Sequence, residues 1–501
     1  MTRAFRMGQP MKFIAFDLGA SSGRVAVASY DGSHIRLENV HSFPNGATRL
    51  ADGLYWDFIG IWNGYLSGIR EGLSRYPEVR SVGACTYCND FSFVDRDGAL
   101  LAPVRSYRDR RTVRTEDYSY SIMSREELYS VSGNQIAPFN TLMQLSAMKA
   151  EGNDFVLSHA DNLLFLPDLL TFYLCGERVT ERSIASVTQM YDHGASDWSC
   201  EVLERFGIGR GIFAPFASAG TVAGTVSPSV LEGIGIPARR DIKAVVTAEH
   251  DTASAFMAAR ADENTLVISS GTWSLAGCES AGPVISDFGF RHNIANEGGI
   301  EGHHRLIRNV MGNWIMQEVL REYGPACMRG GFAKLDAEAA RLDPYRFVID
   351  VDAPAFFEPL GMREKISGVC MEKYGAAPSS PAEFAVCVGT SLAMKYRWAM
   401  EKLAQLRGRD FGSINIIGGG SNDSLTAQRT ADVTGLPVVC GPADASVFGN
   451  VIFQLIASGE ISEVGEGRAI VGSSVDFRHF EPALAARDDA AYKKFLSDFS
   501  L

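Results

Sequence analysis

The residues best suited to chemistry lie in one stretch of the sequence, Thr247 to Leu275. In it an apolar strand leads into His250 and Asp251, and a helical run of small residues follows. Asp251 fits two compatible roles. As a helix N-cap it would accept hydrogen bonds from the free N–H groups of the first turn. As a general base at a strand end it would take the proton of a substrate hydroxyl, and a helix N-terminus would keep its carboxylate ionised.

A second strand in the same stretch ends in a glycine-containing turn, Ser269 to Trp273. The backbone N–H groups of this turn and the hydroxyl of Thr272 can face a phosphate. A similar strand-turn-strand pattern occurs between residues 13 and 30, where Gly19 takes the place of Gly271. The sequence therefore predicts a duplicated strand-turn-strand element, with one copy in each of two domains.

A third glycine motif, Gly418 to Gly420, follows another apolar strand. Consecutive glycines let the backbone approach a flat or anionic group, although this motif taken alone favours a plain turn. Around the three motifs, strand-like and helix-like segments alternate, which predicts an α/β protein. Helical spacing of apolar residues predicts helices over residues 309–322, 331–342 and 381–406.

The composition limits the possible partners. A chain of 501 residues exceeds one hydrophobic core, so we expect two domains. The net charge of −12 argues against nucleic acid or an anionic membrane surface as a partner, because both require a basic face. No apolar run approaches the roughly 18 residues of a transmembrane helix. A small molecule is the expected partner, and the oligomeric state stays open.

The cysteines indicate the compartment. Nine cysteines, an odd number scattered through a long chain, fit reduced thiols in the cytoplasm better than a disulfide framework. Cys85 and Cys88 form a CxxC pair without a second pair or nearby histidines, which favours packed thiols over a zinc site. The first residues show no signal-peptide cleavage pattern, so we expect a cytoplasmic protein.

In combination and in order, the motifs resemble those of the FGGY carbohydrate kinases. The resemblance runs from about Phe13 to beyond Gly449. The segments that carry it are DLGASSGR (17–24), YRDRRT (107–112), EHDTASA (249–255), SSGTWSL (269–275), NEGG (296–299) and the glycines at 418–420.

This resemblance implies two actin-like, ribonuclease-H-like ATPase domains with the active site in the cleft between them. It implies an N-terminal extension over residues 1–11, a first domain over 12–255 with the sugar site and one phosphate hairpin, and a second domain over 256–490 with the nucleotide site and the other hairpin. The implied activity is ATP-dependent phosphorylation of a sugar hydroxyl with Mg²⁺.

The resemblance also implies a role for individual residues. Asp251 would be the general base, and Asp17 would place Mg²⁺ through water. The expected sugar contacts are Cys88, Asn89, His250, Asp251, Thr252 and Asn309. The expected nucleotide and phosphate contacts are Ala20, Ser21, Ser22, Gly23, Arg24, Thr272, Gln317 and Gly419.

Within the family, the chain most resembles the members that phosphorylate L-rhamnulose at its 1-hydroxyl. One segment departs from the pattern of these members. Where that pattern has Thr-Trp-Gly-Val-Asp, this chain has Thr-Tyr-Cys-Asn-Asp at residues 86–90. Cys88 removes space and Asn89 adds a donor and an acceptor, so another ketose or polyol, such as L-fuculose or xylulose, is the alternative substrate.

A non-catalytic ATP- or sugar-binding protein on the same scaffold is the alternative of a different class, because actin-like folds also serve chaperones and regulators. A regulator would carry a basic DNA-binding helix-turn-helix, for which the residues before Met11 are too few. The joint presence of the motifs therefore favours the kinase.

Overall fold

The computed structural model describes residues 9–239, 241–300, 302–324, 331–357, 360–483 and 486–501. Residues 1–8, most of the expected N-terminal extension, lie outside these ranges. The chain forms two compact units. Unit 1 runs up to Ala258 and includes Ser280–Arg305 and Ala445–Val475, whereas unit 2 comprises Ala259–Glu279, Leu306–Asp444 and Asp476–Leu501.

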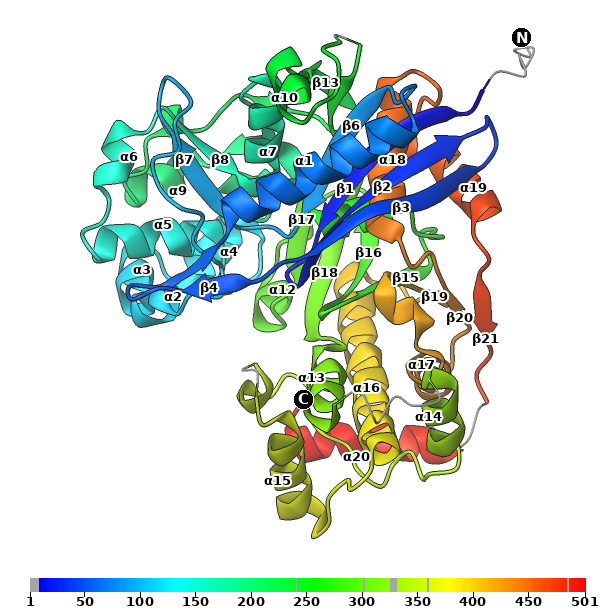
Figure 1. Cartoon of the computed structure of the whole chain (residues 1–501). Coiled ribbons are helices and arrows are strands. Elements are labelled where there is room, and N and C mark those ends of the chain that lie inside the picture. Colours follow the sequence, from blue (N-terminus) through cyan, green and yellow to red (C-terminus); the bar gives the residue numbers. More distant parts are fainter. Residues whose placement is uncertain (1–8, 240, 301, 325–330, 358–359, 484–485) are drawn as a thin grey trace. The chain divides into compact units, whose positions relative to one another are not determined.

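A six-stranded sheet in the order β13-β14-β6-β1-β2-β3 forms the centre of unit 1 (Figure 1). Its strands are β1 (Met11–Leu18), β2 (Ser22–Tyr30), β3 (Ile35–Pro44), β6 (Ser81–Thr86), β13 (Thr221–Thr225) and β14 (Lys243–Val246). Strand β1 pairs antiparallel with β2 and parallel with β6, which also pairs parallel with β14. Four consecutive residues of β1, from Phe13 to Phe16, are buried, as expected of a strand covered on both faces. Helix α1 (Phe58–Arg75) packs across β2 and β3.

Helices from near the end of the chain complete unit 1. Helix α18 (Ala445–Ala457) packs against α11 (Asp251–Met257) and against β1 and β6, and α19 (Val464–Ser474) packs against β3. Gln454 of α18 donates a hydrogen bond of 2.9 Å to the Ile14 carbonyl and accepts one of 2.6 Å from the Ser81 hydroxyl. A Cβ at Gly449 would lie 1.8 Å from the Ser254 carbonyl oxygen, so only glycine allows α18 to approach α11 this closely.

A second, mostly helical region of unit 1 has its own apolar core. It surrounds the antiparallel pair β7 (Phe91–Val94) and β8 (Asn162–Phe165). Its helices are α2 (Arg111–Arg114), α3 (Glu116–Ile122), α4 (Arg125–Ser132), α5 (Thr141–Ala150), α6 (Phe155–His159) and α9 (Cys200–Arg205). Helix α7 (Leu166–Cys175) continues from β8 and packs against β6, β13 and β14, so it joins this region to the central sheet.

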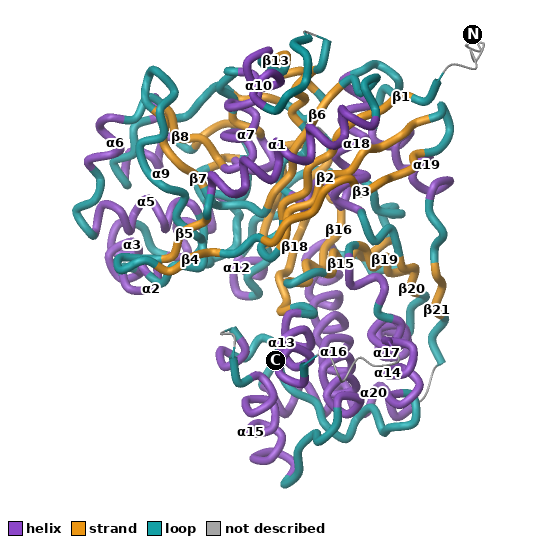
Figure 2. Tube along the Cα trace, viewed as in Figure 1, coloured by secondary structure: helices purple, strands orange, loops and turns teal. Residues whose placement is uncertain are grey.

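Unit 2 is built on a second sheet, whose neighbouring strands follow the order β18-β16-β15-β19-β20-β21 (Figure 2). Its strands are β15 (Thr265–Ser270), β16 (Trp273–Ser280), β18 (His303–Met311), β19 (Ser413–Ile417), β20 (Val438–Cys440) and β21 (Arg478–Phe480), and the first three residues of β18 are counted with unit 1. Its helices are α13 (Trp314–Tyr323), α14 (Gly331–Ala339), α15 (Met362–Tyr374), α16 (Pro381–Arg407), α17 (Ser424–Thr434) and α20 (Ala486–Phe499). Among the described helices, none has both the length and the apolar character needed to cross a membrane.

The predicted duplication is confirmed. In unit 1 a hairpin of β1 and β2 continues through parallel pairing of β1 with β6, and in unit 2 a hairpin of β15 and β16 continues through parallel pairing of β15 with β19. The predicted helix over 381–406 is also confirmed as α16. The helix predicted over 309–322 is wrong at its start, because residues up to Met311 belong to β18 and α13 begins at Trp314. Pairing within the sheet overrides the helical spacing of the apolar residues there.

Candidate active site

Three neighbouring strands of unit 1 end at the same edge of the sheet. Asp17 on β1 is the register partner of Cys85 on β6, and the next residue of β6, Thr86, forms a parallel bridge with His250. The Thr86 N–H also donates a hydrogen bond of 2.8 Å to the Glu249 carbonyl. Ligands of open α/β sheets bind beyond the carboxyl ends of the strands. The sheet topology therefore brings Asp17 and the His250–Asp251 segment to an edge that suits a ligand.

Asp251 is the first residue of α11, and His250 occupies the N-cap position. One Asp251 carboxylate oxygen accepts hydrogen bonds from the Thr252 N–H (2.5 Å) and hydroxyl (3.2 Å). The N-cap interpretation of Asp251 is therefore wrong, because Asp251 already lies inside the first turn of the helix. About a third of the Asp251 side chain is exposed (32%). Desolvation raises the pKa of Asp251 to about 6, although His250 opposes the rise. The carboxylate can therefore both meet a substrate and accept a proton near neutral pH.

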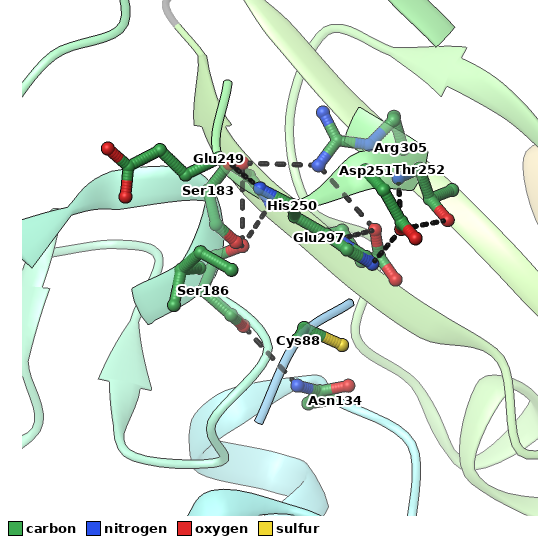
Figure 3. Close-up of polar contacts among 12 residues, drawn as sticks. Cys88, Asn134, Ser183, Ser186, Glu249, His250, Asp251, Thr252, Glu297 and Arg305 are labelled. Atoms are coloured by element: carbon green, nitrogen blue, oxygen red, sulfur yellow. Dashed lines mark hydrogen bonds and ion pairs between the residues drawn. The ribbon is translucent and has the colours of Figure 1, made fainter. Parts of the chain in front are cut away.

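His250 is buried between two carboxylates (Figure 3). Its Nε2 lies 3.6 Å from Asp251 Oδ1, and its Nδ1 lies 3.5 Å from Glu297 Oε2. The Cys88 thiol also lies against the imidazole. Burial alone would lower the pKa of His250, but Cys88 and Glu297 outweigh burial and raise the pKa well above its ordinary value. These two neighbours therefore favour the imidazolium form of His250.

The backbone of this segment is held from behind by Glu181, a buried carboxylate at the end of β9 (Thr180–Glu181). Glu181 accepts hydrogen bonds from the Ser183 N–H (2.8 Å) and from the Glu249 N–H (3.3 Å). The hydroxyl of Ser183 accepts one of 3.3 Å from the His250 N–H. These contacts fix the backbone on which the His250 and Asp251 side chains depend.

The first predicted phosphate hairpin is the turn between β1 and β2. Ser21 and Ser22 are exposed, and Arg24 contacts Asp17 across the hairpin at 3.0 Å. Gly23 is buried, and a Cβ there would lie 2.4 Å from the Phe43 ring. Of the predicted residues, Ala20 to Ser22 and Arg24 are thus accessible, whereas Gly23 serves the close packing beneath the turn.

Cys88 and Asn89 follow β6 and differ in their surroundings. Asn89 is buried and has a φ of 76°, a left-handed conformation that Asn adopts far more readily than a β-branched residue. Its side chain accepts a hydrogen bond from the Thr141 N–H (3.3 Å) and donates one to the Cys88 sulfur (3.1 Å). Cys88, which lies against His250, is therefore better placed than Asn89 to contact a sugar.

The remaining predicted contacts lie in unit 2. Thr272 is in the turn between β15 and β16, and Gly271 in the same turn accepts a hydrogen bond of 3.1 Å from the Asn313 N–H. Asn309 lies on β18, where its side-chain oxygen is buried without a hydrogen-bond partner among the described residues. Gln317 on α13 is exposed. A Cβ at Gly419, also exposed, would meet no atom within 4 Å, so this loop is open to an approaching ligand.

The sequence interpretation missed three buried residues near these groups. Glu297 lies within ion-pair distance of His250, and Arg305 lies within ion-pair distance of Glu297. Glu297 belongs to the NEGG segment, to which the sequence interpretation assigned no chemical role. Asp90 is buried and accepts a hydrogen bond of 2.5 Å from the Trp56 indole N–H. Desolvation raises the pKa of Asp90 to about 7. Asp90 could have been found from the sequence, because it is a charged residue directly after Cys88 and Asn89.

Comparison with known families agrees with this architecture. Residues 12–258 match the N-terminal domain of the FGGY family of carbohydrate kinases, and residues 266–458 match its C-terminal domain. The chain is 34% identical over 484 residues to a rhamnulokinase of Bacteroides thetaiotaomicron, covering 96% of this chain and 98% of that protein. It is 35% identical to a rhamnulokinase of Klebsiella pneumoniae (strain 342), covering 97% of both.

Solved structures with low sequence identity share the fold. The gluconate kinase of Lactobacillus acidophilus aligns with a TM-score of 0.78 at 15% identity, covering 98% of this chain and 97% of that one. The glycerol kinase of Plasmodium falciparum with ADP aligns with a TM-score of 0.76 at 13% identity, covering 99% and 98%.

Proposed function

Because the chain belongs to the FGGY family of carbohydrate kinases, we propose that it transfers the terminal phosphoryl group of ATP to the 1-hydroxyl of L-rhamnulose. The observation that carries this substrate is similarity to rhamnulokinases from several bacteria, at 34–35% identity over at least 92% of this chain. The motif order and the position of Asp251 at the start of α11, beyond the carboxyl end of β14, support the reaction.

In this proposal Asp251 accepts the proton of the attacking sugar hydroxyl. Its partly exposed carboxylate can reach a substrate, and it is ionised above its pKa of about 6. His250 and Cys88 border the same space and would contact the sugar. Phosphoryl transfer depends mainly on positioning and on donors to the phosphate oxygens, and the turn residues Ser21 and Ser22 in unit 1 and Thr272 in unit 2 would provide such donors.

The residues present fit ATP and Mg²⁺. The exposed first hairpin and the open backbone at Gly419 leave room for phosphates and nucleotide. Among the described residues, no group of three or more His, Cys, Asp or Glu side chains is arranged as a metal site. In this proposal the carboxylate of Asp17 would hold the cation through water, where it would neutralise charge on the phosphate oxygens.

Cys88 supports a second candidate substrate within the same reaction. A side chain larger than glycine beside His250 narrows the space for a sugar, and this favours a ketose or polyol other than L-rhamnulose, such as L-fuculose or xylulose.

The test is sugar-dependent ADP release across L-rhamnulose, L-fuculose, D-xylulose and glycerol, with the product position determined by NMR. We expect the highest kcat/KM with L-rhamnulose and phosphorylation at its 1-hydroxyl. A higher kcat/KM with another sugar would replace the substrate but keep the kinase. ATP binding without turnover of any sugar would instead favour a non-catalytic protein.

A further inference from the structure

Four side chains of unit 1 form a line of alternating charge that begins at the proposed base. Asp251 lies 3.6 Å from His250, His250 lies 3.5 Å from Glu297, and Glu297 lies 3.5 Å from Arg305 (Figure 3). Only Asp251, at one end, is substantially exposed (32%), whereas the other three side chains are 4% exposed or less.

A buried charge needs a neighbouring opposite charge or hydrogen bonds, because an isolated charge in a protein interior lowers the stability of the fold. Burial alone would raise the pKa of Glu297, but His250 and Arg305 reverse the effect and hold the pKa below its ordinary value. Arg305 is fully buried, and its Nη2 also donates to the Gly298 carbonyl at 3.3 Å. Glu297 is therefore an anion held between two cations.

Cys88 also faces the imidazole and contributes to raising the pKa of His250 as a hydrogen-bond partner, but it is a thiol and not a carboxylate. Burial raises the pKa of the Cys88 thiol, so that thiol is neutral at physiological pH. The Ser183 hydroxyl contacts His250 at its backbone N–H, and it donates its own hydrogen bond to Glu181. Asp251 itself is faced by His250, Asp17 and Thr252, of which His250 is the cation. Among the described residues near His250, Glu297 is thus the one fully buried carboxylate within ion-pair distance.

The position of a single proton depends on this arrangement. With one carboxylate beside it, an imidazolium can lose its proton to that carboxylate and leave a neutral pair, which would disable the base. With Glu297 on its other side, His250 keeps the proton and Asp251 stays ionised. When Asp251 then accepts the sugar hydroxyl proton, His250 stays paired with Glu297.

We propose that Glu297 and Arg305 are positioning residues that keep His250 protonated, so that His250 in turn keeps Asp251 ionised and oriented for proton acceptance. This proposal rests on the proposed function for the role of Asp251 as base. In this role Glu297 and Arg305, both nearly fully buried, act through His250.

The experiment compares Glu297→Gln with the parent in two measurements. The first is the pH dependence of kcat/KM, whose acidic limb reports the free enzyme. We expect this limb to move up by about one pH unit in the variant, with activity recovering at higher pH. The second is NMR titration of the His250 imidazole in the unliganded full chain, assigned by the loss of its signal in His250→Gln. We expect the His250 pKa to fall in Glu297→Gln.

Two further variants guard against a trivial loss of structure. Glu297→Asp keeps the charge and should restore most of the parent profile. Glu297→Gln with Arg305→Met removes both buried charges, so it avoids leaving Arg305 unpaired and should show the same shifts. Glu249→Gln is the matched control, because Glu249 is equally buried and adjacent to His250 but points away from Asp251 (Figure 3).

The possible outcomes distinguish the proposed role of Glu297 and Arg305 from the proposed function of the enzyme. An unchanged His250 pKa in both Glu297→Gln and the double variant Glu297→Gln with Arg305→Met would overturn the proposed role of Glu297, even if the enzyme phosphorylates sugar. Activity reduced equally at every pH would also overturn it, since that is the signature of a merely structural role. Failure of the parent to phosphorylate any sugar would refute the proposed function but leave the NMR measurement of His250 informative.

Discussion

Two nitrogens of Arg24, Nε and Nη2, both lie 3.0 Å from the same carboxylate oxygen of Asp17. The two residues are register partners across the hairpin of β1 and β2. The proposed Mg²⁺ ligand and a proposed phosphate contact therefore hold one another. The Asp17 carboxylate that would hold the cation through water is thus the same group that now orients the Arg24 guanidinium, so the two proposed roles are linked.

Replacing Arg24 should affect the nucleotide more than the sugar. In Arg24→Gln a charge-assisted contact to phosphate is lost, and such contacts are worth about 1.5–3 kcal/mol. We expect the KM for ATP to rise about tenfold or more, with little change in the KM for sugar. Arg36→Gln, an exposed arginine on the neighbouring strand β3, is the control. Equal ATP KM values in the two variants would remove Arg24 from the phosphate site.

Replacing Asp251 should remove turnover but leave ATP binding nearly intact. The amide of Asp251→Asn keeps the shape of the carboxylate but cannot accept a proton, and a general base contributes about 100- to 10,000-fold. Single-turnover rates measure the chemical step, and calorimetry measures ATP binding. A variant that keeps more than a third of the parent rate would show that another group takes the proton.

The second hairpin can be tested through one hydroxyl. Thr272→Val keeps the side-chain shape but deletes the hydroxyl proposed to contact phosphate, so the KM for ATP should rise by about tenfold. Thr272→Ser retains the hydroxyl and should restore nucleotide handling. Unchanged ATP affinity in Thr272→Val would count against this hairpin as a phosphate contact.

Much of the fold could be predicted because local pattern and final structure agree there. The strands around Gly19 and Gly271 are apolar runs ended by glycine turns, and both form hairpins in their sheets. The helix over residues 309–322 failed at its start because β18 gains more from pairing in the sheet than its apolar spacing suggests. Such pairing depends on distant strands and leaves no local signal.

The site was only partly predictable for a similar reason. Asp251 and His250 stand beside each other in a recognisable motif, whereas Glu297 and Arg305 reach His250 through the fold, about 50 residues further along the chain. Asn89 carries a donor and an acceptor, and the sequence predicts it as a sugar contact. In the structure both contact protein groups, because the left-handed backbone turns this side chain inward.

A buried carboxyl cluster behind the site should make stability fall as pH rises. Desolvation raises the pKa of Asp168 to about 8 and that of Glu249 well above its ordinary value. The folded state therefore binds protons that the unfolded state has already released above about pH 4. Between about pH 4 and its pKa of about 8, the proton on Asp168 lowers the free energy of unfolding by about 1.4 kcal/mol per pH unit, and the proton on Glu249 acts in the same direction.

The variant Glu249→Gln removes one of these acids. We expect it to match the parent in urea unfolding near pH 5 and to exceed the parent in stability near pH 8.5. Glu372→Gln, at an exposed position of α15, should show no such pH-dependent difference. A stability gain in Glu249→Gln that is equal at both pH values would contradict the ionisation argument.

Sugar preference should depend on Cys88 more than on its neighbour. Cys88→Gly enlarges the space beside His250 and restores the glycine of the closest family pattern, whereas Asn89 is better left unchanged because a valine would be strained at a φ of 76°. One side chain in a sugar pocket shifts preference by about 1–3 kcal/mol. We expect the ratio of kcat/KM for L-rhamnulose to that for L-fuculose to increase in Cys88→Gly, and Cys88→Ala to give an intermediate ratio.

The comparison is made by ADP release under identical ATP and Mg²⁺ concentrations. Identical ratios in the parent and both variants would show that residue 88 does not choose the sugar, and would direct attention to Asp90 as the other polar group of this segment.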